Sequence, residues 1–234
     1  MSALLVWGAA LPPTADLAQL SQAAPPLQMM ALLVALSLVP FAVVLLTSFG
    51  KMAVVLSLTR SALGTQQAPP TLVLTGLAIV LSFHVMAPVG TSMAEALRTA
   101  WNGGSDAASL VAAAQAALSP LRDFLVRHGS EASRLQFLEM AVELRGEGVE
   151  PPPADALSII VPAFVVTELS EAFQLGFMIF LPFLVLDMVV ANVLLALGMQ
   201  TLSPSQVSLP FKLLLFVSVD GWALLSRGLV LGYR

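Results

Sequence analysis

The chain contains no cysteine and few charged residues. Without cysteine among its 234 residues, disulfide bonds, thiolate metal sites and cysteine nucleophiles are all excluded. Charged residues make up only 10% of the chain, whereas about a quarter of an ordinary soluble domain is charged. The net charge is −4 and the basic residues form no cluster, so we do not expect nucleic-acid binding.

Recognisable catalytic and metal-binding motifs are also missing. The chain has no HExxH, GxGxxG, Walker A or GxSxG pattern. His84 and His128 are too widely separated to indicate a metal site, and we interpret His84 as a hydrogen-bonded structural residue. Asp187 and Asp220 could supply the two aspartates of an intramembrane protease, but neither follows a Gly-x-Gly. We therefore expect no enzyme activity, no cofactor and no metal.

Apolar side chains dominate what is present. They account for 58% of the residues, and the mean hydropathy is +0.91. A water-soluble monomer could not bury this much apolar surface, so the surplus must face lipid or other subunits. The first residues are apolar but carry no positive charge, which favours a frayed or partner-docked terminus over a cleaved signal peptide. The expected class is an all-α, membrane-type subunit.

Four apolar blocks cover about residues 27–58, 71–89, 157–197 and 207–231. As single helices the first and third would be ~50 and ~60 Å long, whereas the hydrocarbon core of a bilayer is ~30 Å thick. Interior prolines kink or break helices, so we predict helical hairpins interrupted at these residues. Broken helices at membrane depth persist only when protein surrounds them or a cavity lies beside them, which indicates an assembly. The prolines are Pro40 in the first block and Pro162 and Pro182 in the third, whose two halves should meet near Pro182.

The segment between the second and third blocks is polar. It holds nine acids and five arginines, and we expect it to form a small helical domain outside the bilayer. Ser119 and Pro120 predict a helix start, and a short helix should follow Ser130. Lys51 and Arg60 flank the first short loop without an acid nearby, which predicts a cytoplasmic loop and places the acidic domain on the far side. The predicted division is 1–26 (N-terminal segment), 27–90 (first apolar hairpin), 91–156 (polar helical domain) and 157–234 (broken-helix hairpins of the pore region).

A few charges interrupt the last two apolar blocks. A charge near the centre of a bilayer costs at least ~2.5 kcal/mol on insertion scales, so it usually faces a partner or a cavity. Glu168 and Glu171, three residues apart, share a helix face. Lys212 is the only cation between Asp155 and Arg227, and Asp187 is its foremost candidate partner. The turn after the third block carries Met199, which could be ordinary filler or a deformable seal in a pore.

The apolar blocks and the segments between them contain an ordered series of short motifs. The strings are 47–58 (TSFGKMAVVLSL), 62–64 (ALG), 66–70 (QQAPP), 85–89 (VMAPV), 163–164 (AF), 168–169 (EL), 172–177 (AFQLGF), 181–183 (LPF), 196–199 (ALGM), 209–212 (LPFK) and 219–222 (VDGW). They resemble those of the FliP/SctR family of type III secretion export proteins. The likeness covers roughly residues 27–100 and 118–225, and long ordered strings of this kind rarely arise by chance. Lys51 and the pair Gln66-Gln67 resemble the virulence injectisome branch more than the flagellar one.

The resemblance implies a structural, pore-forming subunit of the export gate, which passes unfolded proteins across the bacterial inner membrane within a basal body. It implies a homopentamer joined by SctT-like and small two-helix SctS-like subunits and by an SctU-like switch protein. Met199 then matches the start of a methionine loop that closes the pore, where Gln200 and Thr201 replace further methionines and predict a more polar constriction. Glu168, Asp187 and Lys212 match charged positions implicated in subunit packing.

A proton-coupled secondary transporter stays open as an alternative. Its carboxylates would come from Glu168, Glu171 and Asp187, although the paired, inverted halves typical of many transporters are not evident in the sequence. A transporter should also work without partner subunits.

Overall fold

The computed structural model describes residues 25–65, 68–101, 107–145, 151–199 and 201–234, and in these ranges the chain forms eight helices and no strand. The all-α class predicted from the sequence is therefore confirmed. The helices are α2 (Pro25–Leu46), α3 (Phe49–Ala62), α4 (Thr71–Ala100), α5 (Ala107–His128), α6 (Glu131–Arg145), α7 (Leu157–Ala196), α8 (Pro204–Ser218) and α9 (Gly221–Leu231).

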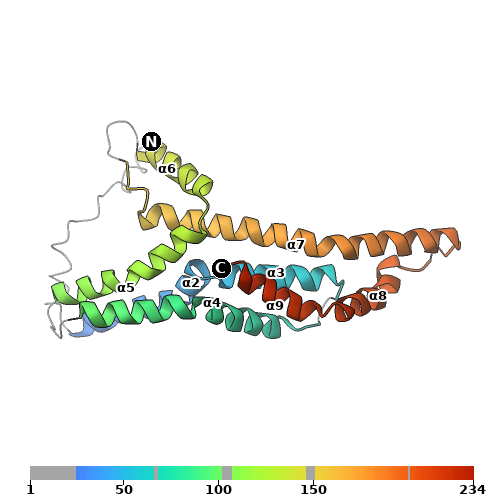
Figure 1. Cartoon of the computed structure of the whole chain (residues 1–234), viewed down its shortest axis with the longest axis horizontal. Coiled ribbons are helices and arrows are strands. Elements are labelled where there is room, and N and C mark those ends of the chain that lie inside the picture. Colours follow the sequence, from blue (N-terminus) through green and yellow to red (C-terminus); the bar gives the residue numbers. More distant parts are fainter. Residues whose placement is uncertain (1–24, 66–67, 102–106, 146–150, 200) are drawn as a thin grey trace.

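The molecule is elongated, and α7 extends along most of its length (Figure 1). Helix α3 lies along the middle of α7, and α9 lies beside α4. Helix α4 extends past α3 to the end where it packs along α5, α6 packs near the start of α7, and α8 lies against the other end of α7. One long helix, α7, therefore connects the end where α6 lies with the end where α8 lies.

The predicted break near Pro182 is wrong, because α7 is one continuous helix of 40 residues that includes both Pro162 and Pro182. Each proline removes one backbone hydrogen bond. Ending the helix at such a point would instead leave four N–H groups and four carbonyls without partners in apolar surroundings, at a larger cost. The helix therefore tolerates each proline.

The first block does break, but at Thr47 and Ser48 rather than at Pro40, which lies inside α2. The described end of α2 and α3 meet there at an angle of 64°. The Thr47 hydroxyl donates to the Val43 carbonyl (2.5 Å) and accepts from the N–H of Phe49 (3.3 Å). Such local side-chain bonds compete with the helical pattern and favour the bend.

The polar segment also differs from its predicted organisation. Helix α5 passes through Pro120 without a new start at Ser119, while α6 follows Ser130 as predicted. The N–H of Gly129 donates to the Leu125 carbonyl (2.8 Å) as α5 ends. The predicted division between residues 90 and 91 falls inside α4, which continues to Ala100.

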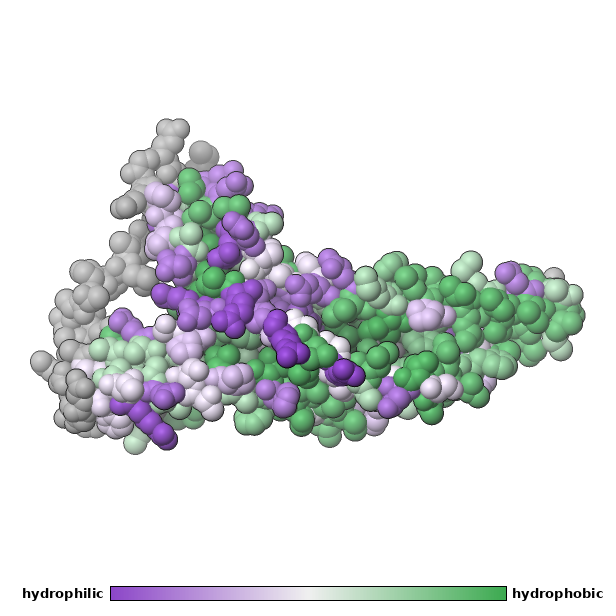
Figure 2. Space-filling model, viewed as in Figure 1, coloured by the Kyte–Doolittle hydropathy of each residue, from purple (hydrophilic) through white to green (hydrophobic). Residues whose placement is uncertain are grey.

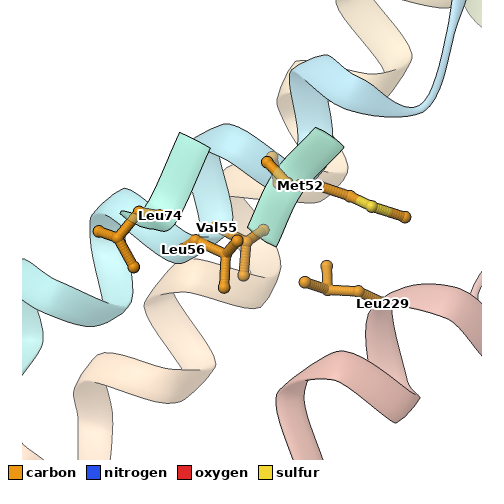
Figure 3. Close-up of a cluster of buried hydrophobic side chains, with 7 residues drawn as sticks. Met52, Val55, Leu56, Leu74 and Leu229 are labelled. Carbon is orange, nitrogen blue, oxygen red and sulfur yellow. The ribbon is translucent and has the colours of Figure 1, made fainter. Parts of the chain in front are cut away.

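The principal core lies where α3, α4, α7 and α9 meet (Figure 3). Met52, Val55 and Leu56 of α3 are buried against α4 and α9. On the opposite side, Gly176 lets α7 approach Leu58 of α3, because a Cβ atom at position 176 would lie 2.2 Å from Leu58 Cδ1. Figure 3 labels five residues of this core, Met52, Val55, Leu56, Leu74 and Leu229.

Apolar side chains cover much of the outer surface at the end formed by α7 and α8, while polar side chains gather at the end formed by α5 and α6 (Figure 2). Helices α4 and α7 are each long and apolar enough to cross a membrane. Two bent pairs, α2 with α3 and α8 with α9, would bring the number of spans to four among the described residues. The chain is therefore a membrane-associated, multi-helix subunit.

Candidate functional site

A buried ion network centres on Lys51, which lies in the first turn of α3 and is only 4% exposed. Its Nζ is 2.9 Å from Oε1 of Glu168 and 2.6 Å from Oε2 of Glu171. The two acids are three residues apart on α7, so both reach the same side of the helix, as the sequence predicted. Glu168 is buried, whereas the Glu171 side chain is 48% exposed. These ion pairs therefore join α3 to α7.

Tyr233, just beyond α9, completes this network. Its hydroxyl donates to Oε2 of Glu168, and Lys51 Nζ lies 4.3 Å from the centre of its ring. The ring also stacks on Phe124 of α5, with centroids 6.0 Å apart, and meets His128 edge-on at 5.1 Å. A cation over an aromatic face is attracted by the ring quadrupole. Tyr233 therefore ties the C-terminal helix to α3, α5 and α7 at one point.

His128 at the end of α5 is the titratable group on the polar side of this network. Burial lowers the pKa of His128, and the nearby charges of Lys51 and Arg127 lower it further, although Glu171 acts in the opposite direction. The imidazole is therefore neutral at pH 7 and packs as an aromatic ring against Phe124 and Tyr233.

This lowered pKa predicts that acid destabilises the fold through His128. The unfolded histidine binds a proton near pH 6.5, while the folded one resists it, so stability is fully present above pH 6.5 and is lost as pH falls below that value. From pH 7.5 to 5 the melting temperature of the detergent-solubilised wild type should therefore fall further than that of H128Q. Equal acid shifts in the two proteins would contradict this role.

A second ion pair lies toward the far end of α7. Lys212 Nζ on α8 is 2.6 Å from Asp187 Oδ2, so the two residues that the sequence suggested as partners meet within one chain. Lys212 also donates to the Ala62 carbonyl (3.4 Å), and the Ser208 hydroxyl donates to Asp187 Oδ1 (2.5 Å). Lys212 is buried and Asp187 is partly exposed. The pair fixes α8 against α7 and against the end of α3.

Charge exchange tests this pair. D187K or K212D alone should lower the amount of chain in the membrane at least tenfold, because each leaves like charges facing each other in apolar surroundings. The double variant D187K/K212D restores opposite charges and should recover a large part of the loss, measured by immunoblot of membrane fractions. If the double variant is as defective as the singles, the attraction between the two charges is not what the site requires.

Two of the three predicted gate residues, Met199 and Thr201, lie at the apolar tip between α7 and α8. Met199 is 46% exposed, and Thr201 is also exposed. Met199 and Leu202 contribute to an apolar hollow of about 340 Å³ formed with the end of α7. Gln200, the third predicted gate residue, lies outside the described residues. The tip therefore presents apolar surface without a closed core of its own.

Sequence reasoning misassigned two residues and missed a third. Lys51 was expected beside an aqueous loop, but it is buried in α3 with two acid partners, so it carries no information on orientation. His84 lies exposed on α4 rather than as a bonded internal residue. Tyr233 was not identified from the sequence. It is the only tyrosine of the chain and lies two residues beyond the fourth apolar block, which was a signal that could have pointed to it.

Within the described ranges, no three histidine, aspartate or glutamate side chains come together as a metal-binding group. The long apolar helices and the two internal ion networks together define a structural membrane subunit with a polar helical end. Comparison with known proteins agrees, and the chain belongs to the FliP family, whose model matches residues 32–229.

Relatives at similar levels of identity come from several secretion systems. The chain is 45% identical over 199 residues to Yop proteins translocation protein R of Yersinia pestis, covering 85% of this chain and 92% of that protein. It is 43% identical to the hypersensitivity response secretion protein HrcR of Ralstonia nicotianae, covering 86% and 94%. It is also 43% identical to the flagellar biosynthetic protein FliP of Pectobacterium carotovorum, covering 86% and 76%.

Proposed function

We propose that this chain is a structural, pore-forming subunit of a type III protein secretion export gate. Membership of the FliP family carries the proposal, because relatives named for hypersensitivity secretion, Yop translocation and flagellar biosynthesis align with most of the chain. The distribution of apolar surface supports it. Exposed large apolar side chains continue along α2, α4, α7 and α8, far beyond what a soluble monomer exposes.

The assembly we propose has several copies of this chain, five by family resemblance, around a conduit for unfolded proteins. SctT-like and SctS-like subunits and an SctU-like switch protein would complete it in the bacterial inner membrane, within the basal body. Lys51–Glu168–Glu171 and Asp187–Lys212 would hold each copy in a defined shape, so that neighbouring copies meet preformed surfaces. The tip that bears Met199, Gln200 and Thr201 would narrow the conduit.

The ion pairs also bear on the transporter alternative, for which the comparisons give no support. A proton-coupled carboxylate must change protonation and partner during a cycle. Glu168, Glu171 and Asp187 each lie within 3 Å of a lysine Nζ, an arrangement suited to a static fold.

Native mass spectrometry tests the proposal. The chain is co-expressed with the other export-gate proteins of the same bacterium, extracted in mild detergent and transferred intact to the gas phase. An oligomer of this chain with small two-helix subunits is the expected result. A monomer or simple dimer that never associates with those proteins would contradict it.

A further inference from the structure

An apolar groove of about 370 Å³ lies between α7 and α9. Met178, Pro182 and Phe183 form its α7 side, and Leu224 and Gly228 belong to its α9 side. It is open to the outside of the molecule, and Leu224 is 65% exposed. A groove with walls on two helices over about two turns of each is long enough to receive apolar side chains from a further helix.

The α9 side of the groove allows close approach. A Cβ atom added at Gly228 would meet nothing within 4 Å, so this glycine leaves open space beside the groove.

The α7 side of the groove offers a hydrogen-bond acceptor. Pro182 has no N–H, so the carbonyl of Met178, four residues earlier, lacks its usual helical donor. Both residues border the groove. An occupant that brings a polar donor would therefore find an acceptor in an otherwise apolar wall.

One charge lies at an end of the groove, because Asp220 is at the bend between α8 and α9, between Val219 and Gly221 of the groove wall. A second charge on α9, Arg227, lies two helical turns further along and is not among the lining residues. Both are exposed, and neither belongs to an ion pair among the described parts of the chain. The left-handed backbone of Asp220 (φ 51°) accounts for an aspartate or an asparagine there, but it does not require a negative charge.

We propose that this groove docks an apolar transmembrane helix of a different subunit, whose lysine or arginine pairs with Asp220. A lipid acyl chain could fill the groove but supplies no cation, and a phosphate headgroup would be repelled by the carboxylate. A second copy of this chain is less suited, because Lys51 and Lys212 of its apolar helices are engaged in internal ion pairs and Arg60 donates to Thr71. The remaining cations on these helices are Arg98, in the last turn of α4, and Arg227 on α9, so a contact with a second copy is an outcome that the crosslink below distinguishes.

The inference rests on the proposed function, since it needs an assembly of membrane subunits. A photo-crosslinking residue, benzoylphenylalanine, is placed at Leu224 in the full chain, which is co-expressed with the other export-gate proteins. The same residue at Leu72, which is 83% exposed on α4 and lies outside the groove, is the control. We expect Leu224 to crosslink to another subunit through a helix that carries a lysine or arginine, identified by peptide mass spectrometry.

Two substitutions test the charge of Asp220 and the open space at Gly228 separately, and each has a control substitution elsewhere in the chain. D220N keeps a residue suited to the left-handed backbone and removes only the charge, so the crosslink from Leu224 should fall at least fivefold. E139Q, on α6 at the polar end, removes an exposed acid elsewhere and should leave it unchanged. G228L fills the open space and should abolish the crosslink, while G76L on α4, where a Cβ atom also meets nothing, should not.

The outcomes are distinguishable. If the chain enters the assembly but Leu224 crosslinks only to lipid or to another copy of itself, the inferred occupant is wrong and the proposed function stands. An undiminished crosslink in D220N overturns the charge pairing. If no variant and no wild type enters any assembly, the proposed function itself has failed.

Discussion

Replacing Lys51 by methionine should abolish secretion and remove most of the chain from the membrane. K51M leaves Glu168 buried without a cation and Glu171 beside it, so two like charges lie next to each other on one face of α7. Removing one partner from a buried ion pair typically costs about 3–5 kcal/mol, a large share of the stability of a domain. The level of the chain in membrane fractions and the amount of cargo protein in the medium measure the effect.

A second substitution shows whether charge is the cause. In K51M/E168Q the buried charge disappears with its partner, so part of the membrane level should return, because losing both partners costs less than losing one. R98Q, which removes an exposed cation from the end of α4, is the matched control and should behave as wild type. Wild-type levels and secretion in K51M would show that Lys51 does not hold α3 to α7.

Substituting Gly176 should also have a large effect. In G176A the new Cβ would lie 2.2 Å from Leu58 Cδ1 and close to two further atoms of the same side chain, so α3 and α7 must move apart. Overpacking of this kind costs about 1–3 kcal/mol, which outweighs the roughly 0.5–1 kcal/mol that alanine normally gains over glycine in a helix. The melting temperature of the solubilised protein should fall.

Gly76 provides the control, because a Cβ atom there would meet nothing within 4 Å. G76A should therefore raise the melting temperature slightly while G176A lowers it. Trimming the opposing side chain should relieve the crowding, so G176A/L58A should be more stable than the sum of the two single effects predicts. Simple additivity would show that the two helices are not in the close contact described.

The ion networks have a consequence for how the subunit meets its neighbours. One joins α7 to α3, which lies far earlier in the chain, and the other joins α7 to α8, the next helix along. Charged groups that are satisfied internally leave the surface at the end formed by α7 and α8 mainly apolar. Neighbouring subunits can then pack by shape, with few exposed charges such as Asp220 left to select the partner.

Some features of the fold could be predicted from the sequence because they depend on local composition. Long apolar blocks determine helices in a membrane setting, since every backbone group must be satisfied without water. The end of α3 before Gly64, the end of α5 near Gly129 and the start of α6 after Ser130 follow from residue types at those positions. The motif strings were sufficient to indicate the FliP family.

Other features could be decided only by the tertiary structure. Whether α7 breaks at Pro182 depends on a comparison between one lost hydrogen bond and eight unpaired backbone groups, which its surroundings determine. Which acid pairs with Lys51 depends on helix packing that brings residues 51 and 168 together, although 116 positions separate them. The sequence by itself determined an apolar, helical, family-defined subunit and suggested the pairing of Asp187 with Lys212. Packing over a long distance along the chain determined the partners of Lys51, because no local pattern records which helix faces meet.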